Sequence, residues 1–154
     1  MTTTAPLGTT APLDLLRLSG PDLDDLYRGG TVTAIPRGNG AGTAIFAPGR
    51  GGGRLLAKIT ARVAWQGKVI DEDGSHLVNL VSPLRRRAIK AKVYEADSWL
   101  DGGRAIFIDY SETSMIARWV HDEIREIAPD LYLGLVYLRS RRLPLRFVLD
   151  FSPR

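Results

Sequence analysis

The chain has 154 residues, of which 44% are hydrophobic and 25% charged, and these proportions are typical of one globular domain. The absence of cysteine excludes disulfides, thiolate metal sites and a cysteine nucleophile, and two histidines are too few for a multi-histidine metal site, so we expect no metal and no other cofactor. No run of residues is apolar enough for a membrane span, and the net charge of +4 admits an anionic partner.

Residues 1–18 are expected to form a flexible N-terminal tail, followed by a single domain over 19–154. The segment Thr-Thr-Ala-Pro-Leu occurs at 3–7 and again at 9–13, and such a composition buries too little surface to offset the entropy of ordering. The tail has neither the basic start nor the apolar core of a secretory signal. With no cysteine in the chain, we expect a cytoplasmic protein.

Residues 19–30 are predicted to form a short helix, because Ser19 can cap its start, Pro21 stands in its first turn and glycines follow its last turn. A glycine-rich stretch, 38–53, comes next. It has neither the G-x-G-x-x-G spacing nor the G-K-[S/T] ending of phosphate-binding loops. We therefore favour glycines at turns and strand edges over a phosphate site.

Residues 55–66 fit either a helix or a strand, and we favour a helix to about residue 64 because the segment exceeds the usual strand length. Successive strands joined by short turns predict an α+β, mainly antiparallel β fold, in which the sheet either curls into a barrel or packs under one or two helices. The predicted strands are 65–70, 76–81, 87–95, 104–110, 131–138 and 143–151.

The clearest helical pattern lies at 112–127, between Ser111 as a candidate cap and Pro129 as a helix breaker. Its polar face would meet water, and Arg118 and Asp122 have the spacing of an exposed ion pair there. The apolar face consists of Met115, Ile116, Trp119, Val120, Ile124 and Ile127.

Glu123 falls inside the apolar face of this predicted helix. A carboxylate pressed against a core is paired, protonated or functional, because burial raises its pKa. Glu123 is therefore a candidate general acid or base, although we favour a structural ion pair over catalysis. His121, Asp109 and Tyr110 stand near it in the expected fold and complete a candidate set for metal-free proton transfer.

Several short motifs occur in an order that resembles a known family. Leu55-Leu56 followed by Trp65-Gln66-Gly67-Lys68 is similar to an LL…W-x-G-K stretch, and Asp109-Tyr110 and Leu133-Gly134 follow in comparable order, the first pair reversed. Residues 25–29 stand where the family has its namesake motif, with tyrosine in place of tryptophan. The chain thus resembles bacterial GXWXG-domain proteins, and the resemblance implies a small lipocalin-like β-barrel with an open choice of ligand.

In such a barrel, aromatic side chains are expected to line a cavity for one small ligand, with a lysine and an asparagine as polar anchors. For any one of these aromatic residues, ordinary core packing is the alternative that we favour. The candidate ligand-binding residues are Trp65, Lys68, Asn79, Tyr94, Trp119 and Tyr137.

Two main functions stay open: binding of a small apolar or amphipathic metabolite, and a cofactor-independent isomerase, cyclase or lyase that uses the candidate acid–base residues. We do not expect a nucleic-acid partner, because the run Arg85-Arg86-Arg87 has no aromatic neighbours for base stacking. Apolar residues on both faces of 131–138 indicate a second covered surface, which either a helix or a homodimer partner would cover.

Overall fold

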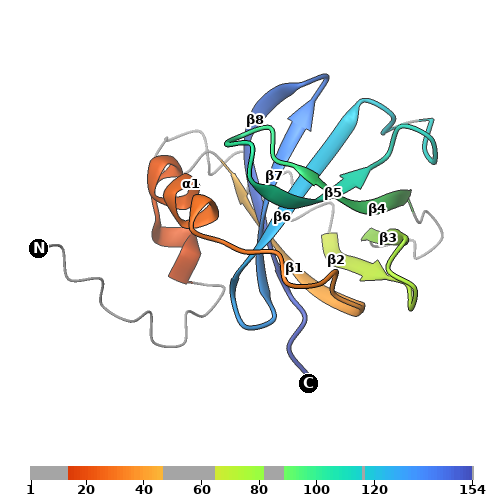
Figure 1. Cartoon of the computed structure of the whole chain (residues 1–154), viewed down its shortest axis with the longest axis horizontal. Coiled ribbons are helices and arrows are strands. Elements are labelled where there is room, and N and C mark those ends of the chain that lie inside the picture. Colours follow the sequence, from red (N-terminus) through yellow and green to blue (C-terminus); the bar gives the residue numbers. More distant parts are fainter. Residues whose placement is uncertain (1–13, 47–64, 82–88, 116, 154) are drawn as a thin grey trace, which may run out of the picture.

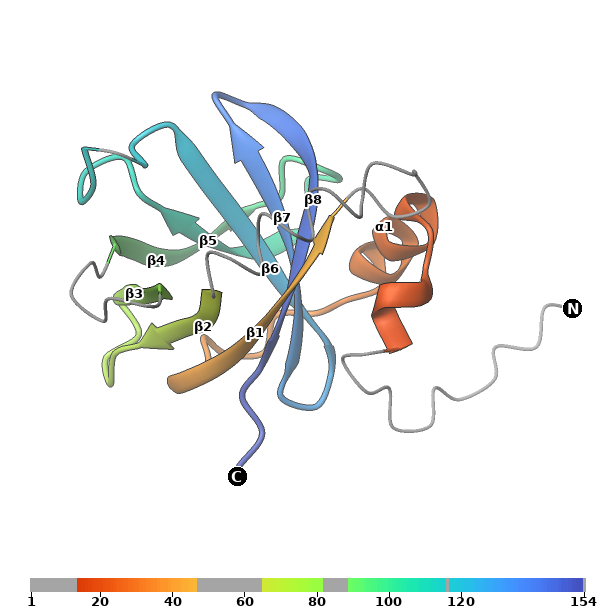
Figure 2. The ribbon, with the colours of Figure 1, turned by 180° about the vertical axis from the view of Figure 1, so that it is seen from behind.

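The dominant element is a closed antiparallel barrel of eight strands in the computed structural model, which describes residues 14–46, 65–81, 89–115 and 117–153 (Figures 1 and 2). The strands follow one another around the barrel in sequence order, and the last pairs with the first. They are β1 (Gly38–Phe46), β2 (Trp65–Ile70), β3 (His76–Val81), β4 (Ile89–Asp97), β5 (Arg104–Asp109), β6 (Val120–Ala128), β7 (Leu131–Leu138) and β8 (Arg141–Asp150).

Helix α1 (Gly20–Arg28) lies against the outside of the barrel and follows a short 3-10 helix, η1 (Asp14–Arg17) (Figure 1). The predicted cap is confirmed, because the Ser19 hydroxyl accepts a hydrogen bond from the backbone N–H of Asp22. Residues 14–18 were expected to belong to the flexible tail, yet Leu15 is 1% exposed and packs in an apolar cluster. The folded part therefore begins before residue 19, and residues 1–13 lie outside the described part.

The barrel wall separates two apolar clusters. Leu23 and Tyr27 of α1 pack on outward-facing side chains of β7, which include Leu133, whereas Tyr132 and Val136 of the same strand belong to the cluster inside the barrel. Strand β7 is thus buried on both faces, and this explains why it carries apolar residues on both faces instead of alternating apolar and polar ones. Of the two covers that the sequence allowed for this strand, α1 is the one seen.

The helix predicted for 112–127 is wrong. Val120–Ala128 is strand β6, and the residues before it form the connection from β5. Pro129 and Asp130 make a tight turn, with a positive φ of 59° at Asp130, that pairs β6 with β7 along its length. The valine and isoleucines that suggested a helix face are β-branched residues that suit a strand, and cross-strand pairing outweighs the local helical pattern.

The remaining predicted strands are confirmed. Strands β2, β3 and β7 have the expected bounds, and β4, β5 and β8 differ from them by a few residues at their ends. The described part of the glycine-rich stretch forms β1, in agreement with strand glycines rather than a phosphate-binding loop. The helix predicted at 55–64 lies outside the described residues, as do the first two residues of the strand predicted at 87–95.

The two ends of the barrel differ. At one end Val32 and Ile35, from the segment between α1 and β1, pack on the apolar side chains of the barrel interior, and the ring of Phe151 meets that of Tyr132 edge-on. We call this the closed end. The opposite end carries the β5–β6 connection and the β7–β8 turn, and we call it the loop end. In the described part of the chain no helix is long and apolar enough to cross a membrane.

Candidate functional site

A glycine bulge sets the position of Lys68 in the wall. Gly67 has a φ of +123°, which residues other than glycine rarely adopt. A Cβ there would lie 2.0 Å from the carbonyl oxygen of Gly40 on β1. The register of β2 against β3 shifts at this point, as at a β-bulge. Lys68 then pairs directly with Asn79 across the two strands, and both side chains are buried. The W-x-G-K motif therefore has a structural reason for its glycine.

Four polar side chains meet inside the barrel. The ammonium of Lys68 on β2 donates to Asn79 Oδ1 on β3 at 2.7 Å, to the hydroxyl of Tyr110 after β5 at 2.6 Å, and to Asp122 Oδ2 on β6 at 3.1 Å. None of the four residues is more than 8% exposed. We call Lys68, Asn79, Tyr110 and Asp122 the interior polar cluster.

The members of this cluster also bond to one another. Asn79 Nδ2 donates to the Tyr110 hydroxyl at 2.6 Å, and that hydroxyl lies 3.2 Å from Asp122 Oδ2, to which it donates. Lys68 Nζ lies 5.4 Å and 5.1 Å from the ring centroids of Tyr110 and Phe147. The cluster is therefore a connected polar network in otherwise apolar surroundings.

Burial determines the electrostatics of the cluster. Desolvation lowers the pKa of Lys68, although the neighbouring Asp122 carboxylate acts in the opposite direction. Desolvation, followed by the charge of Asp122, raises the pKa of Tyr110 well above 10, so its phenol is neutral at physiological pH and can donate a proton. An amine, a phenol and a carboxylate that share hydrogen bonds can exchange protons without solvent.

Glu123 lies on the other side of the wall, under α1. Its carboxylate is fully buried and accepts hydrogen bonds from the hydroxyl of Tyr27 at 2.8 Å, from the hydroxyl of Ser98, and from the backbone N–H of Trp99 at 2.9 Å. Desolvation and the charge of Glu123 raise the pKa of Tyr27. Glu123 thus joins α1 and the β4–β5 loop to the wall, a structural role like the one favoured from sequence, but with hydrogen-bond donors instead of an ion-pair partner.

The pair His121 and Asp109 also faces outward. The imidazole Nε2 lies 3.1 Å from Asp109 Oδ1, and the Tyr94 hydroxyl donates to the second oxygen at 3.1 Å. Desolvation and the charge of Asp109 raise the pKa of Tyr94 to about 12. The indole of Trp99, 46% exposed, lies 5.2 Å from the His121 ring and 5.1 Å from that of Tyr137.

Three of the aromatic residues predicted to line the cavity lie elsewhere in the structure. Tyr94 and Tyr137 lie on the outer wall, and Trp119 is 44% exposed at the loop end, with the guanidinium groups of Arg118 and Arg139 each 4.5 Å from its ring centroid. Among the described residues, the Tyr137 hydroxyl is the one buried side-chain polar atom without a hydrogen-bond partner. The side chain of Trp65 lies outside the described part of β2.

The wall therefore divides the predicted site residues. Lys68, Asn79 and Tyr110 come together inside, whereas Glu123, His121 and Asp109 face outward. Successive side chains of a strand point to opposite faces, so Asp109 points outward and Tyr110 inward although they are neighbours in the chain. The same alternation applies to Asp122, which the sequence analysis placed on the solvent-exposed face of a helix. In strand β6 it points inward, between two outward-facing neighbours. The alternation of Val120, Asp122 and Ile124 is the signal that identifies it once β6 is known to be a strand.

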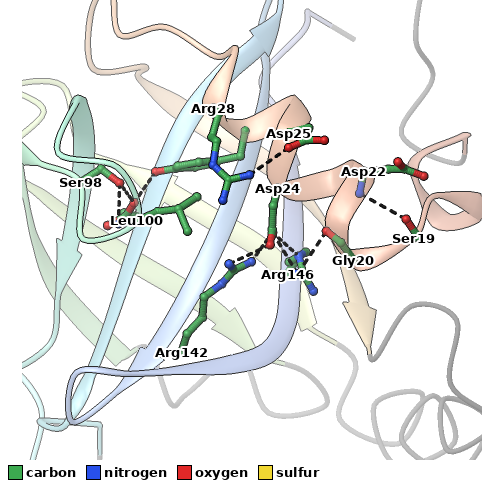
Figure 3. A network of polar contacts seen from close by, with 12 residues as sticks. Ser19, Gly20, Asp22, Asp24, Asp25, Arg28, Ser98, Leu100, Arg142 and Arg146 are labelled. Carbon is green, nitrogen blue, oxygen red and sulfur yellow. Dashed lines mark hydrogen bonds and ion pairs between the residues drawn. The ribbon is translucent and has the colours of Figure 1, made fainter.

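Ion pairs hold α1 to the outer wall. The carboxylate of Asp24 binds Arg142 and Arg146 of β8, and Figure 3 shows both guanidinium groups directed at it from below the helix. Desolvation raises the pKa of Asp24, but the two arginines outweigh it and the pKa is lowered. Arg125 of β6 forms two hydrogen bonds of 2.7 Å with Asp101. These pairs lie on the outer face of the wall, whereas the interior polar cluster lies on its inner face.

Comparison with known proteins identifies a protein of similar fold but indicates no activity. No family model matches this chain, and no curated protein is significantly similar to it. Among solved structures, a protein from Thermomonospora curvata superposes with a TM-score of 0.61 over 89% of this chain and 90% of its own, at 16% sequence identity. The two proteins therefore share a fold. The family resemblance drawn from the short motifs stays a prediction.

Proposed function

We propose that this protein binds a small amphipathic metabolite inside the barrel and holds a neutral oxygen group of it, a carbonyl or a hydroxyl, at the interior polar cluster. The observation that carries the proposal is the cluster itself: four connected polar side chains surrounded by apolar ones. An eight-stranded barrel has the size to hold one small ligand, as lipocalins do. Apolar walls with a few convergent polar groups are the usual composition of a ligand site.

The charges of the cluster favour a neutral head group. Lys68 and Asp122 carry opposite charges, so the cluster as a whole needs no counter-charge. A ligand carboxylate would add an uncompensated charge to a buried site, and this is unfavourable. A carbonyl or hydroxyl oxygen instead accepts a hydrogen bond from Lys68, Asn79 or Tyr110 without changing the net charge.

The position of the cluster favours entry from the loop end. Asn79 stands near the end of β3, Tyr110 directly follows β5, and Asp122 is near the start of β6, and in an antiparallel barrel these positions share one end. This is the loop end, and it is opposite to the closed end, where Val32 and Ile35 pack on the apolar side chains of the barrel interior. The ligand would therefore lie with its oxygen on the cluster and its apolar part against the interior side chains.

The test compares decanol, decanoate and decane, which share one chain length and differ in the head group, by calorimetric titration. We expect decanol to bind at least about tenfold more tightly than either of the others, a difference of ~1.4 kcal/mol. Asn79→Leu should weaken decanol binding, while Lys92→Met, which removes an exposed lysine paired with Glu112 on the outer wall, should not. Tightest binding of decanoate, or equal binding of all three, would contradict the proposal.

A second candidate function is acid–base catalysis on the same ligand, as an isomerase, cyclase or lyase. The hydrogen-bonded amine, phenol and carboxylate of the cluster favour it, because they provide a proton donor and an acceptor within one network. Of the four catalytic candidates named from sequence, Tyr110 takes part in this version. The other three lie on the outer wall and would contribute to folding or to a separate surface.

A further inference from the structure

We propose that Lys68 is a nucleophile that forms a covalent imine with the carbonyl carbon of an aldehyde or ketone held in the barrel. This inference rests on the proposed function and narrows its ligand to carbonyl compounds. The geometry points to it because an amine, a carboxylate and a phenol lie within 3.2 Å of one another, whereas the other lysines that the structure describes, Lys90 and Lys92, lie on the outer wall.

The surroundings of the amine suit this chemistry. A lysine reacts as an amine only when it loses its proton, and burial among apolar groups favours the uncharged form. The Lys68 amine lies 5.4 Å and 5.1 Å from the ring centroids of Tyr110 and Phe147, and Asp122 is placed to receive its proton. The other described lysines differ: Lys90 is exposed, and Lys92 points outward, with its side chain 42% exposed and paired with Glu112.

Each step of imine formation finds a partner in the cluster. Asp122 takes a proton from the Lys68 ammonium, and the nitrogen attacks the carbonyl carbon as the carbon–oxygen double bond opens. The oxygen takes the proton of Tyr110, which regains one from the nitrogen to give the carbinolamine. Asp122 then returns its proton to that hydroxyl, the carbon–oxygen bond breaks, and one water leaves. The product is a protonated imine with the Asp122 carboxylate as its counter-ion.

Formation of such an imine would also activate the bound ligand for reactions at the carbon next to the carbonyl. A protonated imine withdraws electrons from the adjacent carbon and makes its hydrogens acidic. The Tyr110 hydroxyl and the Asp122 carboxylate both lie beside the nitrogen and are placed to move such a proton. Carbonyl compounds that isomerise or cleave at the carbon next to the carbonyl are therefore the expected substrates.

The experiment is reductive trapping on the intact protein. The wild type is incubated with decanal, with and without cyanoborohydride, and analysed by intact-mass spectrometry followed by peptide mapping. We expect one reductant-dependent adduct per chain, located at Lys68. The yield should fall at least about tenfold in Lys68→Arg, which keeps the charge but offers no amine nucleophile, and should be unchanged in Lys92→Met.

The outcomes separate the two proposals. If decanol binds as expected but decanal gives no adduct at Lys68, imine formation is refuted and the binding function stands. Adducts spread over Lys90 and Lys92 according to their exposure would refute it in the same way. If neither decanol nor decanal binds, the proposed function fails as well. Because mapping is done on the wild type, the result does not depend on whether a Lys68 variant folds.

Discussion

Removal of the Asp122 carboxylate tests the energetics of the interior polar cluster directly. In Asp122→Leu the Lys68 ammonium, whose side chain is 4% exposed, loses the carboxylate that pairs with it at 3.1 Å. Breaking a buried pair in this way destabilises a protein by about 3–5 kcal/mol. For a chain of this size that corresponds to a fall of roughly 6–20 °C in the melting temperature. Urea unfolding monitored by circular dichroism measures the change in the free energy of unfolding.

The double variant Lys68→Met with Asp122→Leu separates a charge effect from a packing effect. Two apolar side chains need no partner, so the free energy of unfolding should return to within about 1 kcal/mol of the wild type, or exceed it. Binding of decanol and trapping of decanal should both be lost in the stable double variant. The reasoning is refuted if Asp122→Leu costs less than about 1 kcal/mol, or if the double variant is as unstable as the single one.

Three further predictions concern the parts that position the cluster and α1. Gly67→Ala should lower the free energy of unfolding by more than ~2 kcal/mol in urea titrations, since the Cβ meets the β1 backbone and φ is positive; a neutral effect would refute the bulge. Tyr27→Phe leaves the buried Glu123 carboxylate short of one donor and should cost about 1–3 kcal/mol by thermal unfolding, with no change in decanol affinity. Hydrogen bonds from Arg125 lower the pKa of Asp101 to about 2, so its stabilisation is present above pH 3.8 and is lost as the pH falls toward 2. Asp101→Asn should therefore lose about 1 kcal/mol at pH 7, after allowance for solvent screening, and match the wild type near pH 2.

The pattern of alternation carried most of the strand predictions. In β4, Ala91 and Val93 point inward while Lys90 and Lys92 point outward, as the sequence indicates. Strand β7 was the exception to simple alternation, and its apolar residues on both faces correctly indicated a second cover. That α1 is the cover depends on contacts between Tyr27 and residues about a hundred positions away, which no local pattern contains.

The candidate site was harder to predict because it depends on which side of the wall a residue faces. A helical interpretation of 112–127 grouped Glu123 with the core and left Asp122 in water, whereas in the strand both are buried, Asp122 inside the barrel and Glu123 outside it under α1. The periods of 3.6 and 2.0 residues place neighbouring side chains in different surroundings, so one wrongly predicted element assigns both carboxylates to the wrong surroundings. Lys68 and Asn79 were named from sequence as polar anchors for a ligand; the structure places both inside the barrel, and their contacts with Tyr110 and Asp122 were not predicted.

Local alternation and capping in the sequence were enough to predict the mainly antiparallel fold, most strand bounds and the capped helix. The need for glycine at position 67 became visible only with the neighbouring strand β1 in place. Long-range contacts were needed to see that 120–128 is a strand, that α1 covers β7, and that Lys68, Asn79, Tyr110 and Asp122 meet inside the barrel. Closure of the barrel brings together strands that are distant in the chain, and the energy of that pairing exceeds any preference within a single segment.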